Sequence, residues 1–294
     1  MRALLVANPL AGRVRSPEGV VRVVHALQRA GLEVDLLCPE RPHEPGEEVG
    51  RALAGCDPAD TRVVVAGGDG SIHRVLSAVM NTPFPLAILP VGSVNVLARE
   101  LGIPLSLEAA AQVAATGATR RMDLGLANGR PFATTFGVGF DAAVVGAVQP
   151  GPKRLLGSAL YVAQGLAILA RYRGAHFRIT ADQETVEGHA WLAIVANHPR
   201  YTYRVRICPE AALNDGWLDV CLFRGNSFFR KSSQVIAALL NRHTGRPGVQ
   251  HMRARRFRFE CDPPLPVQLD GDEAGTTPVE VVVAPGALSI VVPR

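Results

Sequence analysis

Short apolar runs recur along the first third of the chain, at intervals that leave room for a helix between them. Residues 3–7, 62–66 and 85–89 read ALLVA, RVVVA and PLAIL, and residues 32–38 read LEVDLLC. Uninterrupted apolar runs of this kind are typical of parallel strands that are buried on both faces. The pattern therefore predicts four strands of a parallel sheet.

Amphipathic segments follow these strands. Ser16 and Pro17 form a helix-start signal, after which the apolar residues up to Leu27 share one helical face, and Gly31 ends the segment. Further helices are expected over residues 47–54, 72–80 and 95–101. Four strand–helix units predict a doubly wound α/β layer, in which ligands bind at the carboxyl ends of the strands.

Beyond Asp123 the pattern changes to short strands separated by tight turns. Asn128-Gly129 is a two-residue hairpin signal, because both residues readily adopt the positive φ of a type I′ turn. Strands are expected over residues 132–138, 177–180, 190–196, 218–223, 255–259 and 279–283, with helices over 157–172 and 228–240. This half of the chain is predicted to be β-rich.

The fold class we predict is α/β with two domains. Residues 1–123 form an N-terminal doubly wound parallel-sheet domain, and residues 124–285 form a C-terminal β-rich, sandwich-like domain. Residues 288–292 are apolar enough to return to either domain, so 286–294 are a candidate completion of the first sheet. The sequence shows no repeat at a fixed period.

Composition narrows the class of protein. The 294 residues are 48% apolar and 19% charged, which is typical of a globular chain. No apolar run of about 18 residues occurs, so no spanning helix is expected, and the N-terminal run suits a first strand better than a signal peptide. We therefore expect a cytoplasmic protein. The five cysteines are scattered without C-x-x-C spacing, so neither a disulfide framework nor a zinc site is signalled.

The net charge of +5 is modest, and it fits an anionic nucleotide, a membrane face or nucleic acid alike. The sharpest basic cluster lies at residues 251–258. There Arg256 and Arg258 alternate with Phe257 and Phe259, as in a strand with one basic face. A solvated outer face of an antiparallel sheet and a contact with an anionic surface both fit this pattern.

The strongest chemical signal is the segment Gly67-Gly68-Asp69-Gly70-Ser71, between an apolar strand and an amphipathic helix. Consecutive glycines let backbone N–H groups approach phosphate oxygens, and the helix N-terminus adds positive potential. Asp69 would repel a phosphate unless a metal ion mediates or the carboxylate accepts a hydrogen bond, which points to Mg²⁺. The other interpretation is a plain strand-to-helix turn.

Seven ordered blocks resemble the diacylglycerol kinase catalytic-domain superfamily, which includes bacterial diacylglycerol kinases and sphingosine kinases. The blocks are Asn8-Pro-Leu-Ala-Gly12, GGDGS at 67–71, Pro90-Val-Gly-Ser-Val-Asn95-Val-Leu-Ala-Arg99, Met122-Asp123-Leu-Gly125, Phe136 to Asp141, Asn214-Asp215-Gly-Trp-Leu218-Asp219 and Gln268-Leu-Asp270-Gly-Asp272. Together they cover nearly the whole chain, and seven in order are far more specific than one.

The resemblance implies ATP-dependent phosphorylation of a lipid hydroxyl, with ATP between the two domains. Asp270 matches the catalytic aspartate, which accepts the proton of the attacking hydroxyl, and Asp272 follows it in the same block. The nucleotide-binding positions are Asn8, Gly12, Gly67, Gly68, Asp69, Gly70, Ser71, Ser93 and Asn95. The positions for Mg²⁺ and its acidic network are Asp215, the backbone around Leu218, Asp69 and Asp123.

This chain departs from the family pattern at several positions. Val96 stands where the family has an aspartate that joins Asp69 and Asp123, which puts the metal network in doubt. Asp272 replaces a glutamate, and Ser93 replaces a threonine but keeps the hydroxyl. His198, in Asn197-His198, has a packed position as its ordinary interpretation.

Three functions remain open at this point. The first is a lipid kinase that acts peripherally at the inner face of a membrane. The second is an enzyme similar to NAD kinase, a related superfamily that shares the GGDG turn. The third is a homologue that binds nucleotide or lipid with little catalysis, because of Val96 and Asp272. We expect no nucleic-acid partner, and an edge strand of the second domain is a candidate homodimer surface.

Overall fold

The computed structural model describes residues 1–7, 16–39, 45–147 and 168–294. These divide into two compact units. Unit 1 comprises Met1–Leu124, Leu213–Gly216 and Ala284–Arg294, and unit 2 comprises Gly125–Ala212 and Trp217–Val283. The division after residue 124 lies one residue from the predicted boundary, and the short return of residues 213–216 to unit 1 was not predicted. Asn8 and Gly12 lie outside the described residues.

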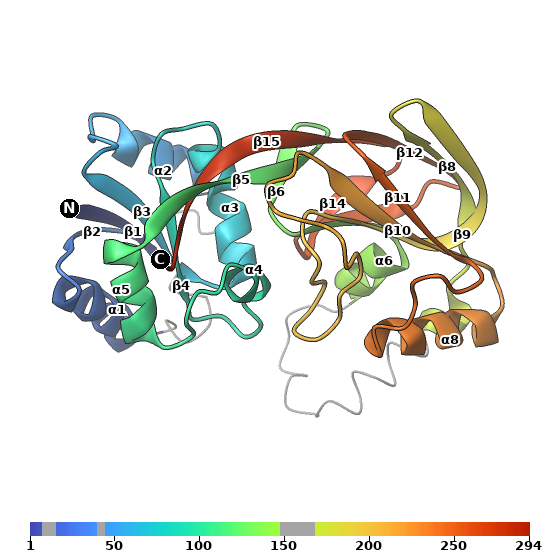
Figure 1. The fold of residues 1–294 in the computed structure, drawn as a ribbon, viewed down its shortest axis with the longest axis horizontal. Coiled ribbons are helices and arrows are strands. Elements are labelled where there is room, and N and C mark those ends of the chain that lie inside the picture. Colours follow the sequence, from blue (N-terminus) through green and yellow to red (C-terminus); the bar gives the residue numbers. More distant parts are fainter. Residues whose placement is uncertain (8–15, 40–44, 148–167) are drawn as a thin grey trace. The chain divides into compact units, whose positions relative to one another are not determined.

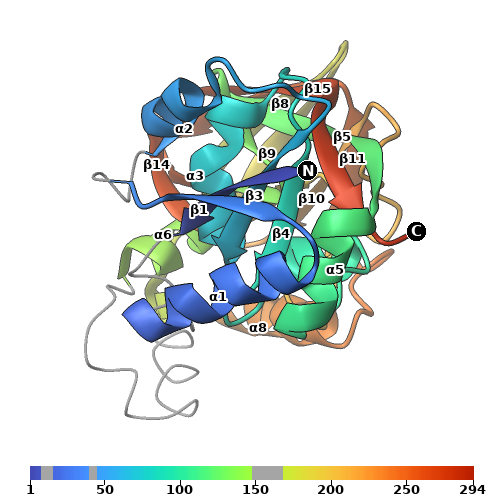
Figure 2. The ribbon, with the colours of Figure 1, turned by 90° about the vertical axis from the view of Figure 1, so that its left-hand side faces the viewer.

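Unit 1 is a parallel sheet between two layers of helices (Figure 2). Its elements are β1 (Arg2–Ala7), α1 (Pro17–Arg29), β2 (Glu33–Leu37), α2 (Gly46–Leu53), β3 (Thr61–Gly67), α3 (Asp69–Val79), β4 (Leu86–Pro90), α4 (Val96–Glu100), α5 (Leu107–Thr116), the start of β5 (Ala118–Ala127) and the end of β15 (Val279–Val292). The strand order is β2-β1-β3-β4-β15, and these neighbours pair in parallel. Helices α1 and α5 cover one face, and α2 and α3 cover the other.

The burial of the strands confirms the apolar-run prediction. Strand β3 is buried along its whole length and β4 likewise, whereas β2 at the sheet edge is partly exposed. The helix-start signal is also confirmed, because the Ser16 hydroxyl accepts a hydrogen bond from the Gly19 N–H at 3.1 Å. Helix α5 was missed, since its buried residues are alanines, which give little hydrophobic periodicity.

Unit 2 is built from antiparallel strands (Figure 1). Its elements are the rest of β5, β6 (Arg130–Phe132), β7 (Thr135–Gly139), α6 (Phe140–Ala147), β8 (Ala175–Ala181), β9 (Glu184–Ala196), β10 (Leu218–Arg224), α8 (Phe228–Leu239), β11 (Val249–Ala254), β12 (Arg256–Asp262), β13 (Pro266–Leu269), β14 (Asp272–Thr276) and the start of β15. The order is β14-β13-β7-β9-β8-β12-β15, and β10 pairs with β9 and β11.

Strand β9 organises unit 2, because its first half pairs with β8 and its second half pairs with β7 and β10. Phenylalanines 132, 136, 177, 257 and 259 fill the core beneath these strands. The predicted turn at Asn128-Gly129 is confirmed, with φ of 45° and 81°. The α/β class with a β-rich second part is therefore as predicted.

One expectation about unit 2 needs correction, and one is tested only in part. Residues 279–292 form one strand, β15, rather than two, because the Ala-Pro-Gly-Ala segment bends the strand at Gly286 (φ 57°) without ending it. Of the predicted helix 157–172, residues 168–172 lie in the described part of the chain, and 168–171 of these are helical. Strands β11, β13 and β14 are four to six residues long and contain no continuous apolar run, so the apolar pattern did not reveal them.

Helix α8 is fixed to unit 2 by two buried polar side chains. Gln234 accepts a hydrogen bond from the indole N–H of Trp191 at 2.8 Å and donates to the carbonyls of Arg224 and Gly248. Lys231 donates to the carbonyls of Leu169 and Tyr172 at 2.9 and 2.6 Å. Burial lowers the pKa of Lys231. No helix among the described residues is long and apolar enough to cross a bilayer.

Candidate functional site

The glycine-rich turn follows β3 at the carboxyl edge of the parallel sheet. A Cβ on Gly67 would lie 2.3 Å from the Ser71 side chain, and a Cβ on Gly92 would lie 2.4 Å from Cα of Gly68. Such distances exclude any larger residue, so the turns after β3 and β4 pack backbone against backbone. A Cβ on Gly70 would meet no atom within 4 Å. Packing therefore does not require Gly70, and its bare backbone leaves space at the start of α3.

Asp69 opens α3, and its carboxylate reaches the turn after β4. It accepts hydrogen bonds from the backbone N–H groups of Val96 and Leu97 at 3.0 and 3.1 Å. These are the first N–H groups of α4, which have no partner inside that helix, so Asp69 caps it. Of the two reasons considered for an acid in this turn, the structure shows the accepted hydrogen bond. A metal role for Asp69 stays a prediction.

The turn after β4 contains three of the positions named above. Asn95 is buried and left-handed (φ 54°), and its side-chain amide donates to the carbonyls of Pro90 and Gly92 at 3.1 and 2.9 Å. Its Oδ1 is buried and meets no hydrogen-bond donor among the described residues. Ser93 is exposed, while Val96 is only 8% exposed. An aspartate at 96 would place a second carboxylate in a buried position beside Asp69.

Asp123 lies in β5 and is buried. Its carboxylate accepts the N–H groups of Gly216 and Gly286, each at 2.7 Å, and its own N–H donates to the Leu213 carbonyl at 2.7 Å. One side chain thus joins three distant segments of unit 1. Asp215 belongs to the same fixed loop. The ligand atoms of Asp69, Asp123 and Asp215 do not form a close group in the described part of the chain.

The residues fit Mg²⁺ in their chemistry. Mg²⁺ binds hard oxygen ligands, uses one or two carboxylates and keeps several waters. Asp215 offers a half-buried carboxylate on the loop that Asp123 holds, and Leu218, three residues on, begins β10. The assignment of Asp215 and Leu218 to Mg²⁺ stays a prediction.

Asp270 sits at the tip of the hairpin between β13 and β14. Asp270 and Gly271 have φ of 49° and 92°, as a type I′ turn requires. The Asp270 carboxylate accepts the N–H groups of Ala133, Thr134 and Thr135 at 2.8 to 2.9 Å, and the Thr134 hydroxyl also donates to it. These donors fix its position and stabilise its charge. Asp272 begins β14, opposite Leu269.

A buried chain of hydrogen bonds supports this hairpin. The side chain of Gln268 accepts the Gly271 N–H at 2.7 Å and donates to Asp141 at 2.6 Å, and the Tyr201 hydroxyl donates to the other oxygen of Asp141. Burial raises the pKa of Asp141, and the two hydrogen bonds act in the opposite direction. Nothing in the sequence points to Tyr201. Gly137 leaves room for Asp141, since a Cβ there would lie 2.2 Å from its Oδ2.

His198 lies inside unit 2 and interacts electrostatically with Asp270. Burial lowers the pKa of His198 to about 4, Asp270 acts against this and Arg200 adds to it, so the imidazole is neutral at pH 7. Its Nδ1 accepts the Arg200 N–H at 3.2 Å. His198 is fully buried, which agrees with the packed position expected for it.

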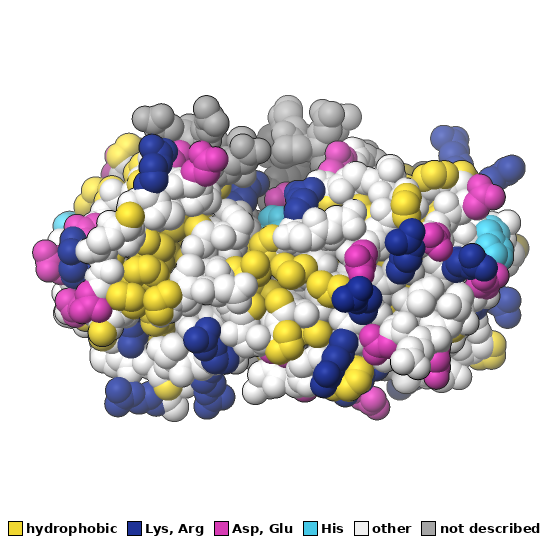
Figure 3. Space-filling model, turned by 90° about the horizontal axis from the view of Figure 1, so that it is seen from above, with side chains coloured by type: hydrophobic (Ala, Val, Ile, Leu, Met, Phe, Trp, Pro, Cys, Tyr) yellow, Lys and Arg dark blue, Asp and Glu magenta, His cyan; other side chains and the backbone are white. Residues whose placement is uncertain are grey.

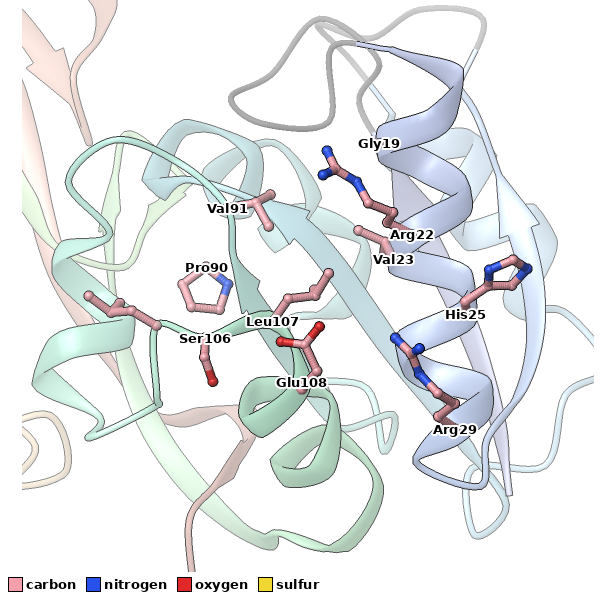
Figure 4. Close-up of a pocket in the computed structure, with 11 residues that line it drawn as sticks. Gly19, Arg22, Val23, His25, Arg29, Pro90, Val91, Ser106, Leu107 and Glu108 are labelled. Carbon is pink, nitrogen blue, oxygen red and sulfur yellow. The ribbon is translucent and has the colours of Figure 1, made fainter.

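Among the described residues, unit 1 also forms a groove of about 570 Å³ between α1 and α5 (Figure 4). Arg22, His25 and Arg29 of α1 line one side, and Ser106 and Glu108 line the other. None of the predicted site residues in the described part of the chain lines this groove. Ser71 instead lines a small hollow with Val6, Pro39 and Val65, where β1, β2 and β3 end.

Two family models match the chain. The diacylglycerol kinase catalytic domain matches residues 2–127, and the YegS C-terminal NAD kinase beta sandwich-like domain matches residues 134–292. A diacylglycerol kinase of Mycobacterium tuberculosis is 30% identical over 300 residues, which are 98% of this chain and 94% of that protein. An uncharacterized protein of Synechocystis sp. is 29% identical over 239 residues, 80% of this chain, and the chain spans 55% of that protein's length.

A solved structure shows the same fold. A crystal structure of a Bacillus anthracis protein matches with a TM-score of 0.80 at 21% identity, and the match covers 100% of this chain and 95% of the other. At this identity the likeness concerns the fold alone. It confirms the predicted arrangement of an α/β part followed by a β-rich part.

Proposed function

This chain belongs to the diacylglycerol kinase catalytic-domain family, and we propose that it transfers the γ-phosphoryl group of ATP to the hydroxyl of a diacylglycerol-like lipid. Membership makes the chain a kinase, that is, a phosphotransferase with a nucleotide substrate. The resemblance carried by the seven sequence blocks is thereby confirmed. The identity of the donor and of the acceptor is the part that we propose.

The observation that carries the proposal is the Asp270 carboxylate of the Gln268–Asp272 block, which is half-buried beside His198 and fixed by three backbone N–H groups and one hydroxyl. In the proposed reaction Asp270 takes the proton of the lipid hydroxyl as its oxygen attacks the γ-phosphorus. The bond from that phosphorus to the bridging oxygen breaks, and ADP leaves. Phosphoryl transfer depends mainly on positioning and on charge neutralisation, which suits a carboxylate fixed in this way.

The glycine turn of unit 1 supports the nucleotide side of the proposal. The space beside Gly70, the exposed Ser93 and the N-terminus of α3 provide donors and positive potential for phosphate oxygens. Asp69 does not oppose this role, because its charge is used to cap α4. Mg²⁺ bound with the nucleotide would neutralise phosphate charge, whereas the structural Mg²⁺ position implied at Asp215 and the Leu218 carbonyl would tie the acidic loop.

The test is transfer of radiolabel from γ-labelled ATP, with Mg²⁺, into either a total bacterial lipid extract or NAD. We expect label in the organic phase from the wild-type chain and none from Asp270→Asn. Label in NAD alone would favour the NAD-kinase-like alternative, which the name of the second family model keeps open. Bound ATP without transfer to either acceptor would favour a binding homologue, as Val96 and Asp272 allow.

We further propose that the kinase reaches its lipid through the exposed side of α8. Phe229 is 83% exposed, and Leu239 and Leu240 are each 61% exposed. No acidic residue occurs from Gly225 to His251, while Arg230, Arg242 and Arg246 in this segment are exposed. An apolar helix face flanked by cations is typical of helices that lie in a bilayer interface, and each cation adds about 1 kcal/mol on an anionic surface.

The arginine-rich strand is a weaker candidate for this contact. Arg256 pairs with Glu280, and Arg258 pairs with Glu260. Basic and acidic side chains are interspersed on the part of unit 2 visible in Figure 3. The ordinary interpretation, a solvated face of an antiparallel sheet, therefore fits the structure better than a membrane contact.

Vesicle sedimentation tests the role of α8. Phe229→Glu should reduce binding to vesicles of mixed zwitterionic and anionic phospholipid by at least tenfold. Val21→Glu, at a 48% exposed position on α1, should leave binding unchanged. Equal binding by the wild type and Phe229→Glu would contradict this docking surface without affecting the proposed reaction, provided that the lipid extract of the transfer assay is dispersed in detergent.

A further inference from the structure

Three metal-ligating side chains meet in unit 2, away from every residue assigned above. They are Cys221 on β10, His251 on β11 and His243 in the loop that follows α8. Cys221 and His251 are directly opposite each other in the β10–β11 ladder. One ligand atom from each of the three side chains lies within 4.8 Å of the other two.

The separation of these atoms suits a transition-metal ion. Sγ of Cys221 and Nε2 of His251 are 3.7 Å apart. Zn²⁺ binds sulfur at about 2.3 Å and imidazole nitrogen at about 2.0 to 2.1 Å in tetrahedral geometry, which places such ligand atoms at about this separation. A site with one thiolate and two imidazoles binds Zn²⁺ in preference to Mg²⁺ or Ca²⁺, because those two ions prefer oxygen ligands.

His243 supplies a second and independent observation. It is fully buried, and its Nε2 lies 2.9 Å from the carbonyl oxygen of Ile207, so Nε2 carries the hydrogen and donates it. That tautomer leaves a lone pair on Nδ1, which is buried and has no hydrogen-bond partner among the described residues. A histidine whose second nitrogen donates to a backbone carbonyl has the arrangement found around metal-bound imidazoles.

The position of His243 is set by its surroundings. Its ring stacks on Phe223, with the ring centroids 6.1 Å apart. The neighbouring Asn241 accepts the Arg206 N–H at 2.7 Å and donates to the Arg204 carbonyl at 2.8 Å, which fastens the loop. The imidazole is therefore held in place before any ligand arrives. A buried nitrogen without a hydrogen-bond partner is unfavourable, and coordination of a metal ion would give it a partner.

We propose that Cys221, His243 and His251 form a site for Zn²⁺ or a similar borderline divalent ion, with a fourth position left for water. Coordination replaces the thiol proton of Cys221, which is released to solvent. The ion joins β10, β11 and the loop after α8, and so fixes the C-terminal end of α8 to the sheet. The site does not depend on the proposed kinase reaction, since it shares no residue with it.

Metal titration of the full chain tests the proposal. After dialysis against a chelator, Zn²⁺ alone should bind with one tight equivalent by calorimetry, and it should raise the midpoint of thermal unfolding. Cys221→Ser and His243→Asn should each weaken binding at least about 100-fold, which is the upper end for loss of a supporting residue. Cys261→Ser and His189→Asn, at a separate thiol and an exposed imidazole of unit 2, should not change it.

Two readouts keep the test decisive if a variant folds poorly. Co²⁺ bound to the wild-type chain should show a thiolate-to-metal charge-transfer band, which Cys261→Ser retains. Zn²⁺ should also protect Cys221 from alkylation under mild denaturant, while the exposed Cys38 reacts equally with and without metal. Absence of the band, or no protection of Cys221 at saturating Zn²⁺, would overturn the site.

Discussion

Two hairpin tips of unit 2 carry an aspartate in the left-handed region and use it in the same way. Asp182, between β8 and β9, and Asp270, between β13 and β14, both have φ of 49°. Each aspartate donates its backbone N–H to a carbonyl on a strand outside its hairpin. Asp182 donates to Arg256 and Asp270 donates to Thr135, both at 2.9 Å. Each carboxylate accepts backbone N–H groups from that same segment.

The two tips differ in their surroundings. The Asp182 carboxylate is exposed and accepts the N–H groups of Arg255 and Arg256. The Asp270 carboxylate is half-buried, has a hydroxyl donor in addition to three N–H donors, and interacts with the buried His198. The hydrogen-bond pattern alone therefore identifies a locked hairpin. The Gln268–Asp272 motif and the buried surroundings, rather than these hydrogen bonds, identify Asp270 as the candidate base.

Exchange of each aspartate for asparagine tests this comparison most strongly. Asn accepts the left-handed conformation, so both tips should keep their shape. Asp270→Asn removes the proton acceptor and should lower kcat by about 10²- to 10⁴-fold. Asp182→Asn should stay within about twofold, since it touches no reacting group on any proposed path. Steady-state transfer of labelled phosphate measures both, and equal losses would reduce Asp270 to a structural role.

Glycines beside the two hairpins should differ in stability. Gly137→Ala forces a Cβ against Asp141 and disturbs Gln268, so unfolding free energy should fall by about 3 kcal/mol. Gly188→Ala, in β9, brings a Cβ to 2.5 Å from Nη1 of Arg224, which can shift at the loss of its hydrogen bond to the Glu187 carbonyl, and it adds backbone strain at φ 136°. It should cost about 1 to 2 kcal/mol. Urea unfolding of both variants gives the comparison, and a larger loss at Gly188 would contradict it.

His198 should give the Asp270 region a pH dependence that the Asp182 region lacks. Its pKa falls from 6.5 to about 4 on folding, so the folded state binds fewer protons than the unfolded state between these values. Stability should therefore fall as pH drops from about 6.5 to about 4, by about 3 kcal/mol in total. Urea unfolding at a series of pH values measures this dependence. The unfolding free energy of His198→Asn should not show this fall between pH 6.5 and 4, whereas that of His189→Asn, at an exposed histidine, should still show it.

The smallest effect concerns hydroxyl groups near the tips. Thr134→Val removes the hydroxyl that donates to Asp270 and should cost about 1.5 kcal/mol, as expected for a hydrogen bond to a charged group. Thr185→Val, beside Asp182, removes only an exposed contact with Thr180 and should cost less than about 0.5 kcal/mol. Thermal unfolding of both variants distinguishes these values, and equal losses would contradict the difference.

Local patterns predicted most of unit 1. Apolar runs predicted β1, β3 and β4, because a strand that is buried on both faces needs apolar residues at nearly every position. Ser16-Pro17 predicted the start of α1. Unit 2 was predicted less completely. Strands β13 and β14 are four and five residues long, and their hairpin is signalled only by the Asp270-Gly271 pair, which was read as chemistry rather than as a turn.

The positions of the candidate site were named from motifs and stay a prediction, and the contacts that these residues make were not predicted. The glycine turn and Asp270 carry recognisable motifs. The hydrogen bonds from Asp69 to α4 and from Asp123 to Gly286 join residues far apart in the sequence, so no local signal reveals them. For the same reason His243 and Cys221 were not paired in advance, because their proximity depends on how the loop after α8 lies against β10.

The position of β15 has a consequence for how the protein is made. Its final segment pairs in parallel with β4, and the Asp123 bond to Gly286 spans 163 residues. A ribosome must release all of unit 2 before this strand is available. Until then β4 has an unpaired edge, which is the kind of surface that recruits other chains. The first unit to be translated is thus the last to be finished, and its need for chaperone protection should end only when the final strand emerges.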